Sequence, residues 1–118
     1  MFGKKKKSTI IESEFSFLIE QGFSLKKYMR PPDIECVYIS NKLEIEADYY
    51  LGVLESYKET MCFDIILTTN GNRENLLKRT DIFGFDLIND LLMKIRYLSA
   101  DEQVEVYAQF LRKTWISY

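Results

Sequence analysis

Histidine is absent from this chain of 118 residues. Its absence removes the commonest general base, and with it the ordinary serine and cysteine triads. The only cysteines, Cys36 and Cys62, do not form a C-x-x-C pair, so zinc sites of the usual Cys/His kinds are excluded too. No dinucleotide-binding, P-loop or H-E-x-x-H motif occurs. The sequence therefore predicts a non-enzymatic protein with no cofactor, no metal ion and no catalytic residue.

Long apolar runs are also missing. No stretch approaches the roughly 18 apolar residues of a membrane-spanning helix. Lys4–Lys7 is followed by polar residues rather than by the apolar segment of a secretory signal. We interpret both cysteines as free thiols, which indicates a reducing compartment, with a Cys36–Cys62 disulfide as the alternative. These features predict a soluble cytoplasmic protein.

Basic residues are scarce outside the N-terminus. The formal net charge is -2, and four of the 16 Lys and Arg residues form the run Lys4–Lys7. The rest of the chain has 12 basic against 18 acidic side chains. Nucleic-acid binders gather Lys and Arg on one face, so we expect neither nucleic acid nor membrane as a partner. The expected organisation is a flexible basic tail over 1–8 and one α+β domain over 9–118.

The clearest local pattern is a β-hairpin over residues 34–50. Two alternating runs flank Asn41-Lys42, which can form a two-residue turn. The predicted register runs from Ser40 opposite Leu43 to Ile34 opposite Tyr49. Because side chains alternate along a strand, apolar residues collect on one face. The other face is predicted to carry Val37, Ile39 and the carboxylates of Glu35, Glu44, Glu46 and Asp48.

Further strands are expected over 23–29 and 61–68, and the second of these adds Asp64 to the acidic face. Asn70-Gly71-Asn72 predicts a turn. Residues 74–78 then form a short edge strand or lead directly to the helices. The predicted fold class is α+β, with an N-terminal helix, an antiparallel sheet of about four strands and two C-terminal helices.

Helices are expected over 10–21, 83–97 and 100–116. Thr9-x-x-Glu12 and Ser99-x-x-Glu102 fit capping boxes at the first and third helices, and Asp81 or Asp86 is expected to cap the second. Helical spacing predicts the buried residues: Ile11, Phe15, Leu18 and Ile19; Ile88, Leu91, Leu92, Ile95 and Leu98; Val104, Tyr107, Ala108, Leu111 and Trp115. Phe17 is expected to widen the first of these stripes.

The row of carboxylates is the main candidate site. Successive carboxylates on one strand face stand roughly 7 Å apart, which could suit a glycosidase or a divalent metal. Pro32-Asp33 also fits the start of the nuclease pattern PD…(D/E)-x-K, but no lysine follows Glu44-Ile45-Glu46 at the required spacing. The remaining interpretations are a solvated sheet face or a surface for a basic protein partner. For that partner, with Tyr50 as an exposed aromatic, the predicted residues are Glu35, Glu44, Glu46, Asp48, Tyr50 and Asp64.

One family resemblance points the same way. The chain resembles the small immunity proteins of bacterial polymorphic-toxin systems over roughly residues 10–70, in Phe15-x-Phe17-Leu18, Val37-Tyr38-Ile39-Ser40-Asn41, Ile45-x-x-x-Tyr49-Tyr50 and Phe63-Asp64-Ile65-Ile66. The resemblance implies a cytosolic protein that occludes a toxin, and an acidic body would suit a basic toxin. The alternatives are an adaptor or homo-oligomeric module that uses the third helix or a sheet edge, and a metal-dependent enzyme.

Overall fold

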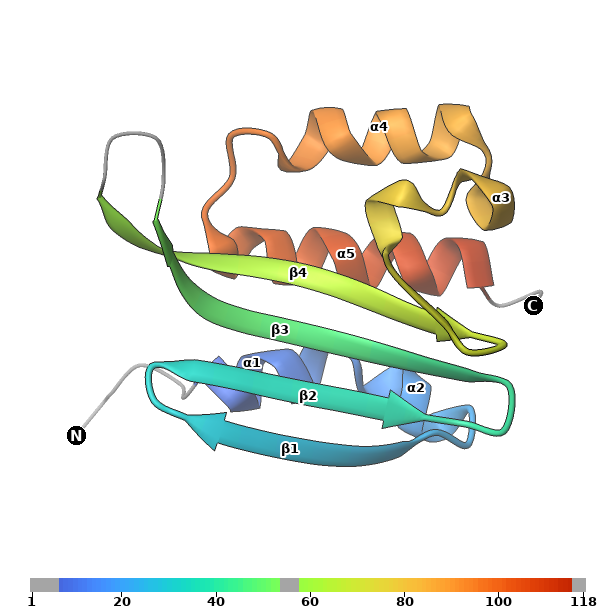
Figure 1. Cartoon of the computed structure of the whole chain (residues 1–118), viewed down its shortest axis with the longest axis horizontal. Helices are drawn as coiled ribbons and strands as arrows, with labels where there is room; N and C mark the ends of the chain where they lie inside the picture. Colours follow the sequence, from blue (N-terminus) through green and yellow to red (C-terminus); the bar gives the residue numbers. More distant parts are fainter. Residues whose placement is uncertain (1–6, 54–57, 116–118) are drawn as a thin grey trace.

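The structure, a computed structural model, describes residues 7–53 and 58–115 and contains one antiparallel sheet (Figure 1). Each strand pairs with its neighbours in sequence, so the sheet is a simple meander. The fold is α+β as predicted, with five strands instead of about four. They are β1 (Ser24–Arg30), β2 (Asp33–Ile39), β3 (Leu43–Val53), β4 (Glu59–Thr69) and β5 (Asn72–Asn75).

The fifth strand begins two residues earlier than the edge strand considered from the sequence. Asn70 and Gly71 both have positive φ, 51° and 79°, which fits a two-residue turn of the kind that joins tight hairpins. β5 then pairs from Asn72 opposite Thr69 to Asn75 opposite Ile66. Its four residues are all polar, so no alternation of apolar side chains marked it as a strand.

The central hairpin has the register predicted from its turn. The Ser40 amide donates to the Leu43 carbonyl oxygen at 2.9 Å, and the pairing runs on to Ile34 opposite Tyr49. β3 and β4 extend beyond β2 as a two-stranded arm that reaches Val53 and Glu59. Of the tail predicted over 1–8, residues 1–6 lie outside the described residues, whereas Lys7 and Ser8 belong to the first helix and Ser8 is buried.

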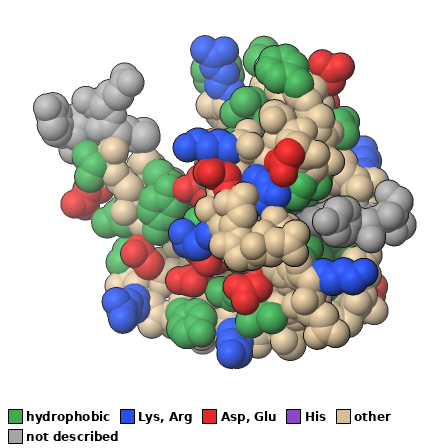
Figure 2. All heavy atoms as spheres, turned by 45° about the vertical axis from the view of Figure 1, so that its right-hand side comes forward, with side chains coloured by type: hydrophobic (Ala, Val, Ile, Leu, Met, Phe, Trp, Pro, Cys, Tyr) green, Lys and Arg blue, Asp and Glu red, His purple; other side chains and the backbone are tan. Residues whose placement is uncertain are grey.

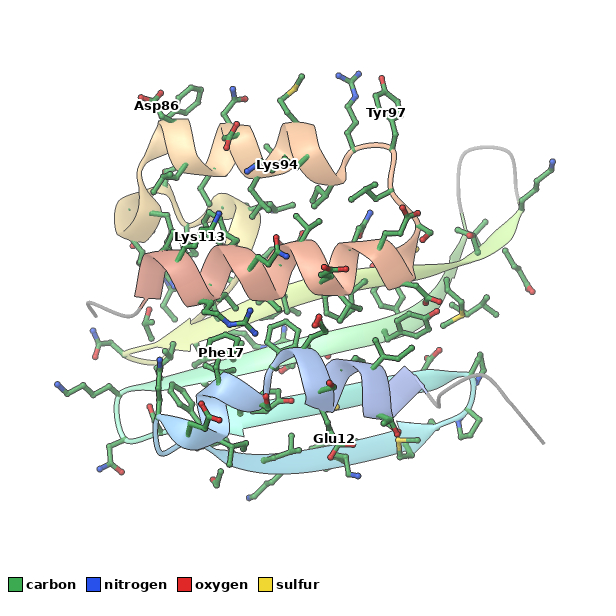
Figure 3. All side chains as sticks on the ribbon, turned by 180° about the vertical axis from the view of Figure 1, so that it is seen from behind. Glu12, Phe17, Asp86, Lys94, Tyr97 and Lys113 are labelled. Atoms are coloured by element: carbon green, nitrogen blue, oxygen red, sulfur yellow. The ribbon has the colours of Figure 1, made fainter. Side chains whose placement is uncertain are left out.

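The helices all lie on one side of the sheet (Figures 1 and 3). α1 contacts β2 and α5, α5 contacts β4, and α4 contacts α5 and the 3-10 turn that follows β5. Within the described ranges, no helix combines the length and apolarity needed to cross a membrane. The helical elements are α1 (Lys7–Glu14), α2 (Ser16–Glu20), a 3-10 turn η1 (Leu76–Lys78), α3 (Thr80–Phe83), α4 (Phe85–Ile95) and α5 (Ala100–Trp115).

The N-terminal helix differs from the prediction in two ways. It begins at Lys7, so Thr9 and Glu12 lie inside it and form no capping box. Glu12 instead forms an ion pair with Lys27 of β1, at a distance of 3.3 Å. The helix also breaks at Phe15, where φ is -98° and ψ is 12°. The break turns Phe15 and Phe17 toward the core and leaves Ile19 47% exposed, so the prediction that Ile19 is buried was wrong.

Of the two caps predicted for the C-terminal helices, one is confirmed and the other is wrong. Ser99 and Glu102 form the predicted capping box, with the Glu102 amide donating to Ser99 Oγ at 3.3 Å and the Ser99 amide donating to Glu102 Oε1 at 3.2 Å. The predicted second helix is divided at Gly84, whose φ of 86° interrupts helical geometry, so neither Asp81 nor Asp86 is its cap. Leu92, expected to be buried, is 41% exposed.

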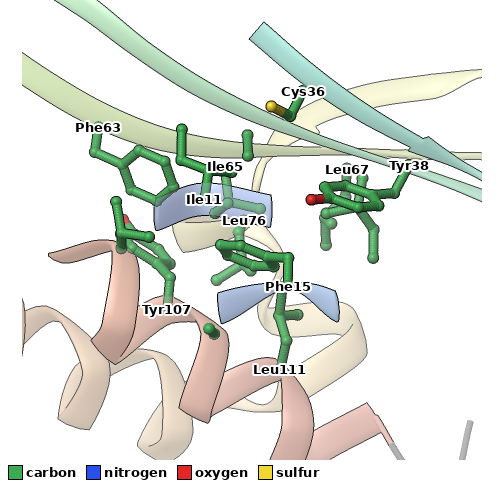
Figure 4. Packing of buried hydrophobic residues seen from close by; sticks show 14 of the residues in the cluster. Ile11, Phe15, Cys36, Tyr38, Phe63, Ile65, Leu67, Leu76, Tyr107 and Leu111 are labelled. Atoms are coloured by element: carbon green, nitrogen blue, oxygen red, sulfur yellow. The ribbon is translucent and has the colours of Figure 1, made fainter. Parts of the chain in front are cut away.

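The core lies between the sheet and the helices (Figure 4). Phe15 stands at its centre and contacts the rings of Phe17, Tyr38 and Phe63 at centroid distances of 6.2, 6.0 and 6.4 Å. The Tyr49 hydroxyl donates to Asp101 at 2.6 Å and ties β3 to the start of α5. Burial of this apolar layer fixes which face of the sheet is left for solvent or a partner.

Candidate functional site: the open sheet face

The sheet face opposite the helices, here called the open face, is not covered by any helix of the described residues (Figure 1). Side chains from β1, β2 and β3 line a hollow of about 730 Å³ on it. Strand alternation brings all the sequence-predicted site residues to this side: Glu35, Glu44, Glu46, Asp48, Tyr50 and Asp64.

The register places three carboxylates in one row across the strands. Asp48 of β3 lies opposite Glu35 of β2 on one side and opposite Asp64 of β4 on the other. Glu46 stands two residues along β3, on the same face. Oxygen atoms of Glu35, Glu46 and Asp48 all lie within 4.8 Å of one another. We call these three residues the carboxylate cluster.

The cluster strongly perturbs Asp48. Partial burial, followed by the hydrogen bond and negative charge of Glu46, raises the pKa of Asp48 to about 8, while Arg73 opposes the shift. Burial and the charge of Glu46 also raise the pKa of Glu35. Asp48 Oδ1 is buried and has no hydrogen-bond partner among the described residues. The protein thus holds a carboxyl group that is close to neutral around pH 7 and incompletely bonded.

Two carboxylates of the open face, one inside the cluster and one outside it, have hydrogen-bond partners within the chain. Arg73 of β5 donates to Glu46 at 2.7 Å, so one arginine partly compensates the cluster. The Tyr50 hydroxyl donates to Asp64 at 2.5 Å. Glu44 is exposed near the hairpin turn and lies opposite Ile39 and Thr68, apart from the cluster. The structure therefore joins Glu35, Glu46 and Asp48, pairs Tyr50 with Asp64, and leaves Glu44 at the rim.

The open face is less uniformly acidic than the sequence suggested. β1 contributes Lys26, Tyr28 and Arg30 to the edge of the hollow, and Val37 is only 7% exposed among these side chains. Figure 2 shows acidic and basic side chains interspersed on part of the molecular surface. The alternation of Ser24, Lys26 and Tyr28 in the first strand already carried this signal. Arg73 could not be assigned to the open face, because no sequence pattern predicted a strand over residues 72–75.

The nuclease and disulfide alternatives gain no support. Asp33 accepts a hydrogen bond from the Leu51 amide at 3.0 Å, where β3 continues past the end of β2, and so has a structural role. Cys36 and Cys62 are free thiols, as predicted. Burial raises the pKa of Cys36 to about 11, which keeps it protonated and unreactive at neutral pH.

The arrangement has two chemical capacities. Three close carboxylates can accept a cationic side chain, and their oxygen atoms are also of the type that hard divalent cations prefer. The second capacity is common to exposed acidic groups and by itself does not identify a metal centre. Comparison with known proteins does not decide between them, because no family model, curated protein or solved structure matches this chain.

Proposed function

We propose that this protein is a non-enzymatic binding module whose open face receives a basic segment of a protein partner. The observation that carries the proposal is the buried, unbonded Oδ1 of Asp48 within the carboxylate cluster. A like-charged cluster that raises carboxyl pKa values disfavours its own ionisation. A guanidinium or ammonium group between Glu35 and Asp48 would donate the missing hydrogen bond and favour the ionised state.

The surroundings of the cluster support a polypeptide partner. Ile39 supplies partly exposed apolar surface in the hollow, and Tyr50 stands at its margin with an aromatic ring and a hydroxyl. Interfaces commonly combine such an apolar centre with a charged rim. Lys26 and Arg30 at the β1 edge would orient the partner, because they repel its cationic groups from that side and leave the cluster as the favourable position.

The first prediction concerns charge on this face. Glu46→Lys is expected to weaken binding of a hexa-arginine peptide at least about tenfold, because it replaces attraction by repulsion in the cluster. Binding by the unmodified protein should also weaken as salt is added. Isothermal titration calorimetry with hexa-arginine, and with hexa-glutamate as the negative probe, measures both effects.

The matched control is Glu105→Lys, which makes the same charge change at an exposed position of α5. Its affinity for hexa-arginine should stay close to that of the unmodified protein. Equal losses in the two variants would contradict a localised site, since they would reflect only net charge. A melting temperature raised by Mg²⁺, Mn²⁺ or Ca²⁺, and no longer raised after Glu46→Lys, would assign the hollow to a metal ion instead.

The narrower form of the proposal is an immunity protein that occludes a basic toxin in the cytoplasm. It is supported by the sequence resemblance and by the acidic excess of the chain outside Lys4–Lys7. A secreted toxin encoded by the adjacent reading frame, neutralised by the unmodified protein but not by Glu46→Lys, would support it. An adaptor or homo-oligomeric role is the alternative, and the exposed side of α4 provides a specific reason to consider self-association.

A further inference from the structure

α4 carries a group of large apolar side chains that the fold leaves in solvent. Phe85 is 72% exposed, Met93 61% and Tyr97, just beyond the helix end, 85%. The opposite side of the same helix is buried through Ile88, Leu91 and Ile95. Figure 3 shows Asp86 and Tyr97 directed away from the rest of the protein at opposite ends of this element. The exposed side of α4 therefore combines these large apolar side chains with polar and charged ones, Asp86, Asn89, Asp90 and Lys94. Exposed apolar side chains of this size are typical of a contact surface.

The two ends of α4 carry opposite charges on this outer side. Asp86 lies in the first turn, and Arg96 follows the last residue of the helix with helical backbone angles. Neither forms an ion pair within the described chain, although Asp90 and Lys94 of the same helix pair at 3.3 Å. Arg96 does stack on the Tyr97 ring at 5.3 Å. One end of the surface thus carries a free acid beside an aromatic ring, and the other a free base beside an aromatic ring.

We infer that α4 is a self-association surface, on which a second copy of this chain packs its own α4 antiparallel about a two-fold axis. Such pairing sets Phe85 opposite the partner's Tyr97 and Asp86 opposite the partner's Arg96, and the symmetry repeats both contacts. Asn89 then lies opposite the partner's Met93 at the centre. A parallel pairing would place Asp86 against its own copy, which is unfavourable.

The same reasoning argues against the sheet edge as the self-contact. β1 is the long free edge of the sheet, but its exposed residues include Lys26, Lys27 and Arg30. Cationic side chains on an edge strand discourage pairing with an identical strand. α4 lies on the helical layer, so association through it leaves the open face accessible, and this inference does not depend on the proposed function.

Sedimentation velocity from micromolar to millimolar concentrations tests the inference. The unmodified protein is expected to change from monomer to dimer over this range. Asp86→Arg and Arg96→Asp should each weaken association about tenfold, because each places like charges at two symmetric positions. The double variant Asp86→Arg/Arg96→Asp should restore the dimer, because the acid and the base exchange positions and opposite charges again face each other.

Lys42→Glu, an exposed charge reversal at the β2–β3 turn, serves as the control and should dimerise normally. All variants change surface residues, and circular dichroism would verify that they fold. A protein that stays monomeric at millimolar concentration would overturn the inference. A dimer that is indifferent to both single reversals would also overturn it and would place the contact elsewhere.

Discussion

Asp48→Asn is expected to stabilise the protein by about 2 kcal/mol at pH 8, although it removes a residue of the proposed binding site. The asparagine has nearly the same shape but no charge to bury beside Glu35 and Glu46. One unit of pKa shift corresponds to about 1.4 kcal/mol, and we take only part of the shift because Asp48 is partly solvated. Urea unfolding of the two proteins measures the difference in free energy of unfolding.

The direction of the pH dependence follows from the raised pKa. Between the ordinary carboxyl value of 3.8 and about 8, folded Asp48 keeps a proton that the unfolded chain has lost. Stability from this group is therefore present at low pH and is lost as the pH rises through about 8. The advantage of Asp48→Asn should be small at pH 4 and largest above pH 8.

Glu44→Gln is the matched control, because Glu44 is an exposed carboxylate on the same strand and face. Its effect on stability should stay within about 0.5 kcal/mol at either pH. If Asp48→Asn destabilises the protein, or its effect is the same at pH 4 and pH 8, the account of the cluster is wrong. A stabilised Asp48→Asn that no longer binds hexa-arginine would show that stability is given up for binding.

Phe15→Ala is expected to reduce the free energy of unfolding by about 4 kcal/mol, the largest loss proposed here. Phe15 is fully buried and touches three aromatic rings from α2, β2 and β4, so its removal leaves a cavity bounded by helix and sheet. A domain of this size is stable by roughly 5–15 kcal/mol in total. Chemical denaturation monitored by fluorescence and circular dichroism provides the measurement.

Ile19→Ala provides the comparison within the same segment. The sequence placed Phe15 and Ile19 on one buried stripe, whereas the structure leaves Ile19 half exposed. Its replacement should cost less than about 1 kcal/mol, because a partly solvated side chain loses little burial. Similar losses for the two variants would mean that the helix continues through Phe15 and that the break between α1 and α2 is incorrect.

The parts of the fold that sequence predicted well are those with a strict local rule. The two-residue turn at Asn41-Lys42 fixes the hairpin register, and strand alternation then decides which side each carboxylate occupies. The same rule placed the five predicted acidic residues on one face, and the observed register adds Tyr50 to it. The capping box at Ser99 and Glu102 was confirmed because both partners lie within one turn of the chain.

The features that were missed depend on contacts between distant segments. The polar strand β5 is held by pairing with β4, and only that pairing carries Arg73 within 2.7 Å of Glu46. The break at Phe15 serves packing against Tyr38 and Phe63, which no local pattern encodes. The closeness of Glu35, Glu46 and Asp48 reflects side-chain directions across two strands, so the perturbed Asp48 could not be singled out in advance.

The most direct test of the central claim is a titration of the ¹⁵N-labelled protein with hexa-arginine, followed residue by residue in amide spectra. We predict saturable shifts concentrated at Glu35, Glu46, Asp48 and Asp64, with α4 and α5 unaffected and the response reduced in Glu46→Lys. Shifts confined to other acidic positions such as Asp86 and Asp90, or no saturable shift at all, would contradict the assignment of the open face as the binding surface.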